Sequence, residues 1–255
     1  MATATNLGFP RIGAHRELKR AVEGYWKGDL TKDELVESAR ALRASHWTEQ
    51  QNLGLDVVPS NDFSYYDQVL DTCAMVGAVP DRFPESLRDG DTVDLDTYFA
   101  MARGLQEKDL EGEDSGVQAM EMTKWFDTNY HYIVPEFSRD TTFSLSSTKP
   151  VDEYEEAKAH GVETRPVLIG PVSFLLLGKT QEDDLEALDL LDDLLPVYAE
   201  VLQKLADAGA EAVQLDEPTL VLDLSDEERA AFTRAYEALS RQVSGLDLHV
   251  ATYFG

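Results

Sequence analysis

Cysteine is nearly absent from this 255-residue sequence, in which Cys73 is the only one. A single thiol excludes an intramolecular disulfide, and its scarcity favours a reducing, cytoplasmic setting. Long apolar runs are also missing. No run approaches the about 20 residues that span a bilayer, so we expect no membrane-spanning helix. The start, MATATNLGFP, has no charged segment followed by an apolar one, so we expect no secretory signal.

Positive charge is scarce as well. The chain has 22 Lys and Arg against 49 Asp and Glu, a formal net charge of −27. Phosphate backbones and anionic lipids would repel such a molecule, which argues against general binding to nucleic acid or to membrane surfaces. An acidic surface in which Arg outnumbers Lys suits a protein kept soluble in concentrated salt.

The charge is unevenly distributed. Residues 1–50 hold eight Lys or Arg and seven Asp or Glu, whereas the remainder holds 14 against 42. Within this balanced start, one helix face carries cations at i, i+3 and i+4, namely Arg16, Lys19 and Arg20. Cations near a helix start oppose the helix dipole. Two explanations stay open: solvated side chains beside acidic neighbours, or an anion held by the cluster and by free N–H groups of the first turn.

Hydrophobic periodicity and turn residues predict strands alternating with helices along the chain. Thr31 with Glu34, and Ser225 with Glu228, read as capping boxes that begin two of the helices. A further helix is expected over residues 95–103. The six predicted strands are residues 6–9, 55–58, 128–134, 167–169, 212–215 and 246–253.

Strands that alternate with helices predict an α/β fold with a parallel sheet. A (β/α)8 TIM-type barrel needs eight such units, so six indicate a barrel truncated after about six βα units. A doubly wound sheet is the alternative, but no G-x-G-x-x-G turn follows the first strand. Residues 143–145 are a possible extra strand, and residues 106–116 are a candidate loop or lid.

The sequence resembles the N-terminal domain of cobalamin-independent methionine synthase (5-methyltetrahydropteroyltriglutamate–homocysteine methyltransferase). The resemblance runs the whole length of the chain. The stretches that carry it are residues 7–13 (LGFPRIG), 16–19 (RELK), 25–26 (YW), 62–63 with 66–67, 122–132 (MTKWFDTNYHY), 166–171 (PVLIGP), 214–218 (QLDEP) and 252–254 (TYF).

This resemblance implies a two-barrel enzyme that moves a methyl group from the folate directly to L-homocysteine, giving L-methionine. It implies a zinc ion in the C-terminal barrel, held by a His-x-Cys pair, a Glu and a second Cys. None of these ligands has a counterpart here, and no cobalamin is involved. The resemblance therefore presents residues 1–255 as an incomplete N-terminal, folate-tail-binding barrel, without the zinc and homocysteine barrel. We expect such a chain to be inactive alone.

The same resemblance implies substrate-binding residues for 5-methyltetrahydropteroyltriglutamate. The family positions match Arg16, Glu17, Leu18, Lys19 and Lys124. Physical reasoning agrees for the three cations, because a polyglutamate tail carries several carboxylates. The implied partners are that folate, homocysteine and the chain's own C-terminal barrel. No catalytic or metal-ligating residue is expected in these 255 residues.

Two other functions stay open. One is a non-catalytic module that binds folate polyglutamate or another anion. The other is an independent barrel hydrolase or lyase that uses Asp216 and Glu217, because carboxylates at a strand end often serve as acid and base. Against this last reading, we favour a structural role for the pair, either binding backbone N–H groups or as a remnant of the duplicated catalytic barrel that the resemblance implies.

Overall fold

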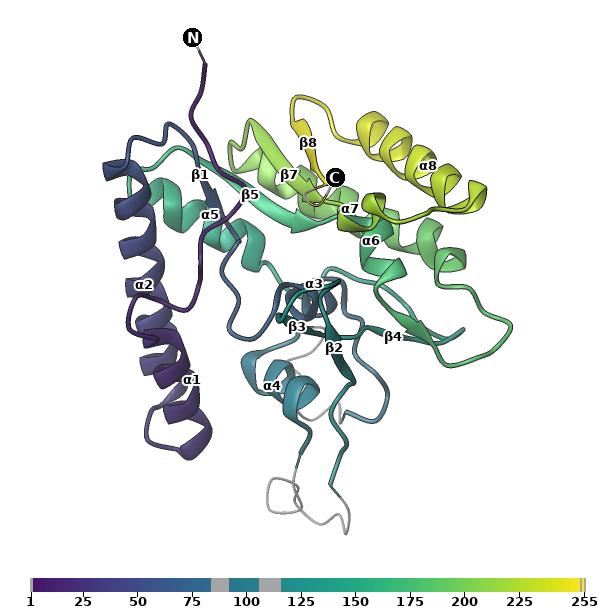
Figure 1. Cartoon of the computed structure of the whole chain (residues 1–255), viewed down its shortest axis with the longest axis horizontal. Helices are drawn as coiled ribbons and strands as arrows, with labels where there is room; N and C mark the ends of the chain where they lie inside the picture. The colour runs from purple at the N-terminus through teal and green to yellow at the C-terminus, as the bar shows by residue number, and fades with distance from the viewer. Residues whose placement is uncertain (1, 84–91, 106–115, 253, 255) are drawn as a thin grey trace.

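The computed structural model describes residues 2–83, 92–105, 116–252 and 254 of the chain. Its centre is a four-stranded parallel sheet (Figure 1). The strands, in spatial order, are β1 (Val58–Ser60), β5 (Thr164–Ile169), β7 (Ala212–Asp216) and β8 (Asp247–Ala251). A single parallel bridge between Thr5 and Val57 adds the N-terminal segment beside β1. The α/β fold with a parallel sheet is thus confirmed.

Helices cover one face of this sheet. They are α2 (Lys32–Asn52), α5 (Lys149–Ala159), α7 (Leu191–Asp207) and α8 (Asp226–Gln242), of which α5 contacts both β1 and β5. Val213 and Leu215 of β7 are fully buried, as are Leu194 and Val201 of α7. Because side chains alternate along a strand, Gln214 and Asp216 point to the opposite face. Of the helices in the described part of the chain, none has the length and apolar character needed to cross a bilayer.

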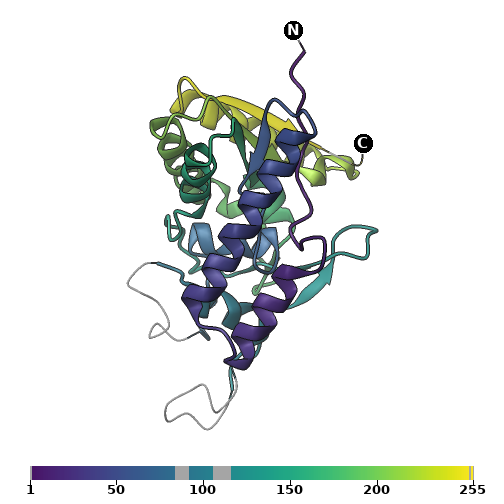
Figure 2. The ribbon, with the colours of Figure 1, turned by 90° about the vertical axis from the view of Figure 1, so that its left-hand side faces the viewer.

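A second group of elements lies beyond the carboxyl ends of the strands (Figure 1). It contains α3 (Gln68–Val76), α4 (Leu95–Arg103), the antiparallel pair β2 (Met122–Lys124) and β3 (His131–Ile133), and the parallel pair β4 (Glu136–Phe137) and β6 (Lys179–Thr180). Helix α1 (Glu17–Lys27) packs against α2 (Figure 2). The remaining short helices are α6 (Pro171–Leu176), η3 (Ala187–Leu190) and η4 (Pro218–Val221).

The local signals for helix starts are confirmed. Thr31 and Ser225 each form a complete capping box, with Glu34 and Glu228 as the reciprocal partners. Helix α4 spans the predicted residues. These starts are readable from sequence because each depends on residues three positions apart.

The predicted strand at residues 6–9 is wrong. Only Thr5 makes a bridge, and the backbone beyond it is bound by side chains instead of a strand ladder. The Asn6 carbonyl accepts from Arg165, the Leu7 carbonyl accepts from Gln214, and the Phe9 N–H donates to Asp62. The predicted strand at residues 55–58 is shifted, because β1 begins only at Val58.

Two other strand predictions also need correction. Residues 128–134 do not join the parallel sheet, because a turn between Trp125 and Tyr130 folds β3 back, antiparallel, onto β2. Residues 143–145 form no strand, since the Ser144 N–H donates to the Val76 carbonyl at the end of α3. The sheet therefore holds fewer βα units than the six predicted. The lid candidate at residues 106–116 lies, except for Gly116, outside the described residues.

Candidate functional site

The predicted anion site lies at the start of α1, where several of the backbone N–H groups are already bonded. Arg16 occupies the N-cap in a left-handed conformation (φ 62°). The His15 N–H donates to the Glu17 carboxylate at 2.9 Å, and the Leu18 N–H donates to the Ile12 carbonyl at 3.3 Å. Hydrogen bonds from its own N–H and from that of His15 lower the pKa of Glu17. Glu17 therefore supplies negative charge of the kind that the dipole favours at this end of the helix.

The five predicted residues differ in exposure. Leu18 is buried in the core, so its part is structural. Arg16 and Lys124 are exposed, and in the described part of the chain neither side chain has a hydrogen bond or an ion pair. Lys19 pairs with Glu23 one turn on at 3.6 Å, with both side chains about half exposed. Such a surface pair is weak and can yield to a stronger anion.

Arg11 connects the segment before α1 to the hairpin that carries Lys124. Its guanidinium donates to the carbonyls of Ser64 (3.1 Å) and Tyr66, and to the Tyr130 hydroxyl at 3.4 Å. Tyr130 lies in the turn between β2 and β3. Sequence reasoning did not single out Arg11 as a site residue. Its place in the LGFPRIG stretch was the one signal that could have identified it. Among the described residues, no hydrogen bond or ion pair joins Arg16 or Lys19 to Lys124.

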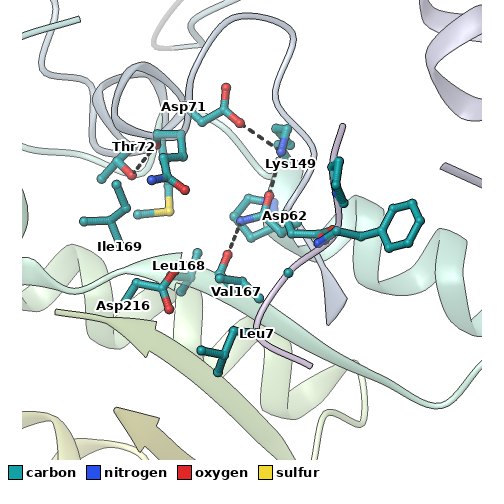
Figure 3. Close-up of a pocket in the computed structure, with 16 residues that line it drawn as sticks. Leu7, Asp62, Asp71, Thr72, Lys149, Val167, Leu168, Ile169 and Asp216 are labelled. Atoms are coloured by element: carbon teal, nitrogen blue, oxygen red, sulfur yellow. Dashed lines mark hydrogen bonds and ion pairs between the residues drawn. The ribbon is translucent and has the colours of Figure 1, made fainter. Parts of the chain in front are cut away.

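A separate cavity of about 420 Å³ lies at the carboxyl ends of β1, β5 and β7 (Figure 3). This is the edge at which parallel α/β folds bind ligands, and the volume is in the range of small-molecule sites. None of the five predicted site residues lines it. Its lining is Leu7, Gly8, Phe9, Pro10, Asn61, Asp62, Gln68, Asp71, Thr72, Met75, Lys149, Pro150, Val167, Leu168, Ile169 and Asp216.

Lys149 is the one cation in the lining, and every hydrogen-bond donor of its ammonium group is bound by the protein's own groups. Its ammonium donates to the Asn61 side-chain oxygen at 2.8 Å and to the Phe63 carbonyl at 2.7 Å. It also forms ion pairs with Asp71 at 3.1 Å and Glu153 at 3.3 Å. An ammonium has three donors, so none is left for a ligand.

Asp62 is the least compensated carboxylate of the cavity. Its Oδ2 accepts from the Phe9 N–H at 2.8 Å, and within the described residues it has no ion pair. Burial raises the pKa of Asp62 to about 7, because the hydrogen bonds and the nearby Lys149 offset only part of the desolvation. Asp62 belongs to a stretch that carries the family resemblance, residues 62–63, but sequence reasoning assigned it no role.

Asp216 and Glu217 do not share a site. Asp216 lines the cavity, and its Oδ1 accepts from Gln214 at 2.7 Å. Glu217 points elsewhere and is fully buried; its carboxylate accepts from the Ser173 N–H in the first turn of α6 at 2.7 Å and from the Tyr236 hydroxyl at 2.8 Å. Burial raises the pKa of Glu217 to about 7. The geometry supports the structural reading of Glu217 over an acid–base pair.

The residues present do not fit a zinc site. Among those that the structure describes, no group of three or more His, Cys, Asp or Glu could hold a metal ion. Cys73 is buried in α3, and burial raises the pKa of its thiol. Among the described residues, the His131 ring has one hydrogen-bond partner, the carbonyl of Asn129.

Comparison with known proteins adds the following findings. Residues 3–255 match the family model described as "Cobalamin-independent synthase, N-terminal domain". Curated relatives named 5-methyltetrahydropteroyltriglutamate–homocysteine methyltransferase are 84% identical in Salinibacter ruber (100% of this chain, 33% of the relative), 56% in Caulobacter vibrioides (99% and 34%) and 52% in Saccharomyces cerevisiae (100% and 33%). The chain thus spans about a third of the length of these relatives.

One solved structure shares the fold. A B12-independent methionine synthase from Shewanella sp. W3-18-1, in complex with selenomethionine, superposes with a TM-score of 0.60. The match covers 89% of this chain and 54% of that chain, at 15% sequence identity. At that identity the likeness concerns the fold alone.

Proposed function

The chain belongs to the family of the cobalamin-independent synthase N-terminal domain, and on that premise we propose that it binds the folate substrate of a methionine synthase. The whole protein would transfer a methyl group from 5-methyltetrahydropteroyltri-L-glutamate to L-homocysteine without cobalamin. This chain would hold the polyglutamate tail through Arg16, Lys19 and Lys124, with Glu17 and Leu18 fixing the start of α1. The zinc and the homocysteine would belong to a C-terminal barrel of a cytoplasmic enzyme.

The distribution of unpaired cations supports this proposal. Of the 20 Lys and Arg residues that the structure describes, 13 form an ion pair. The seven that do not are Arg11, Arg16, Arg20, Lys27, Arg103, Lys124 and Arg165. Four of them fall in residues 11–27, although acidic side chains outnumber basic ones about twofold in the chain.

Two more unpaired cations are connected to the same region. Arg103 of α4 stacks over the Trp26 ring of α1, with its guanidinium carbon 4.0 Å from the ring centroid. Lys124 lies in the hairpin that Arg11 contacts through Tyr130. Only Arg165, buried at the base of the sheet, lies apart. A molecule of net charge −27 repels anions generally, so this local cationic region is where a polyanionic tail would be accepted.

We also propose that the sheet is part of a (β/α)8 barrel. The N-terminal segment, β1, β5, β7 and β8 lie side by side in chain order, and all their pairings are parallel. Barrels are built in this order, whereas a doubly wound sheet reverses its order at a switch point.

The tail-binding proposal is tested by exchanging Lys19 for Ala. Each charge-assisted bond to a carboxylate contributes about 1.5–3 kcal/mol. We expect Lys19→Ala to weaken binding of a triglutamyl folate about tenfold and that of a monoglutamyl folate much less, measured by calorimetric titration of the chain. Lys204→Ala is the matched control, because Lys204 also pairs within one helix turn, with Glu200 at 3.7 Å. An equal loss of affinity for the two folates would contradict a role of Lys19 in binding the tail.

A further inference from the structure

The cavity at the strand ends has the wrong electrostatic character for the polyglutamate tail. Three carboxylates line it, from Asp62, Asp71 and Asp216, and its one cation is committed to the protein's own groups. A tail carboxylate placed here would meet like charges in a partly enclosed space, where they repel more strongly than in water. The cavity therefore calls for a ligand other than the tail.

The charges around the cavity do not cancel. Asp71 is neutralised by Lys149, and its other oxygen accepts from the Tyr98 hydroxyl at 2.7 Å. Glu153, behind the wall, is shared between Lys149 and Arg43. Among the described residues, Asp62 accepts only from backbone N–H groups, its own and that of Phe9, which carry no full charge. A positive ligand would supply the counter-charge that the fold does not provide there.

The other residues that line the cavity indicate the chemical character of the rest of the ligand. Leu7, Met75, Val167 and Ile169 form apolar walls, and the Gln68 amide has no hydrogen-bond partner among the described residues. A bare metal ion is a poor occupant, because Ca²⁺ and Mg²⁺ need about six oxygen ligands and the described residues offer no such group. An organic cation uses both the carboxylate and the apolar walls.

We propose that this cavity binds a small primary ammonium compound, with the ammonium at Asp62 and an apolar body against Val167 and Ile169. Asp216 lines the same space and adds negative potential. A cavity of 150 Å³ holds benzene, so about 420 Å³ accommodates a molecule of about 15 non-hydrogen atoms. The site is separate from the tail-binding residues, none of which lines it.

The ionisation of Asp62 should make the affinity of the cavity for an amine depend on pH. The pKa of Asp62 is raised to about 7 by burial; Lys149 opposes the shift, and Glu153 adds to it. An alkylammonium stays protonated to about pH 10, so raising the pH from 6 to 8 ionises Asp62 without discharging the ligand. We expect the affinity for the amine to rise severalfold over that interval.

The test compares hexylamine with hexanol, which has the same chain but no charge. Binding to the chain is followed by two-dimensional NMR, with the Phe9 amide as reporter because it donates to Asp62. We expect hexylamine to bind at least tenfold more tightly than hexanol at pH 8, and to lose most of that advantage at pH 6. Hexanol binding as tightly as the amine, or a pH-independent ratio, would overturn the proposal without any mutation.

Asp62→Asn tests the assigned residue. Its amide oxygen can still accept from Phe9, so the fold should persist, while amine binding should fall at least tenfold. Asp184→Asn is the control with the same change in net charge, because Asp184 forms an exposed pair with Arg139. Unchanged binding in Asp62→Asn would refute the assignment. Displacement of hexylamine by 6-methylpterin would also refute it and would make the cavity a pterin pocket.

The outcome is independent of the tail-binding proposal. Lys19→Ala should leave hexylamine binding intact, and triglutamate should not displace the amine. Loss of amine binding in Lys19→Ala would show that the two sites are not separate.

Discussion

At the scale of single residues, Asp216 and Glu217 are adjacent carboxylates that have different structural surroundings. The two follow one another at the end of β7, so their side chains point to opposite sides. Asp216 lines the cavity, whereas Glu217 is bound to the first turn of α6 and to Tyr236 of α8. Gly170 permits this contact, because a Cβ there would lie 2.1 Å from the Glu217 carboxylate.

Glu217→Gln tests the structural role of this carboxyl group. The folded-state pKa is raised to about 7, above the value of the unfolded chain, so its contribution to stability is full below about pH 4.5 and is lost as the pH rises through 7. Gln cannot ionise, so the stability of the variant relative to the parent should improve by about 2 kcal/mol between pH 5 and pH 8.

Urea unfolding at the two pH values measures this difference. Asp62 and Asp67 also have a pKa raised to about 7, but they are common to both proteins and cancel in the comparison. A relative stability that does not change with pH would mean that Glu217 stays ionised in the folded chain.

At the scale of elements, N-cap residues determine where helices begin, and the N-cap residue Asp67 also binds a neighbouring strand. Thr31 satisfies donors within its own capping box. Asp67 accepts from Val69 and Leu70 at the start of α3 with one oxygen, and from Ile133 of β3 with the other. It therefore fixes the hairpin that carries Lys124 to the helix that closes the cavity.

Truncation of the two caps should differ accordingly. Thr31→Ala is expected to cost about 1 kcal/mol of unfolding free energy, the usual value for a cap. Asp67→Ala leaves three backbone donors unpaired at a buried position, so it should cost at least twice as much. Urea denaturation of both variants measures the ratio. Equal losses would show that the bond to Ile133 adds nothing.

At the scale of the whole molecule, the net charge makes the stability of the fold and the binding of an anionic ligand respond in opposite directions to added salt. A charge of −27 repels itself in the compact state, so added salt should stabilise the fold by screening. The attraction that we propose between the α1 cations and a polyanionic tail would be weakened by the same screening.

We expect the thermal midpoint to rise and the affinity for triglutamyl folate to fall as NaCl increases from 0.02 to 0.5 M. Calorimetry follows both in the same buffer. Sucrose at matched osmolality is the control for effects other than charge. A midpoint that fails to rise would contradict the importance of self-repulsion, and an affinity that does not fall would contradict tail binding by charge.

The sequence by itself determined what depends on neighbours along the chain. Capping boxes at Thr31 and Ser225, helix α4 and the alternation that makes the sheet parallel were all readable, because helix starts and amphipathic faces depend on residues a few positions apart. The long family stretches identified the cationic start of α1 as a candidate binding site.

Only the tertiary structure decided which distant groups meet. The segment at residues 6–9 is extended and apolar like a strand, but side chains of Arg165, Gln214 and Asp62 bind its backbone. The Glu17 carboxylate, which accepts from the His15 N–H, lies where it compensates the α1 dipole. The separation of Asp216 from Glu217 and the missing counter-charge of Asp62 likewise depend on packing between distant segments, which no local pattern specifies. Ser173 and Glu217 are 44 residues apart, and Phe9 and Asp62 are 53 apart.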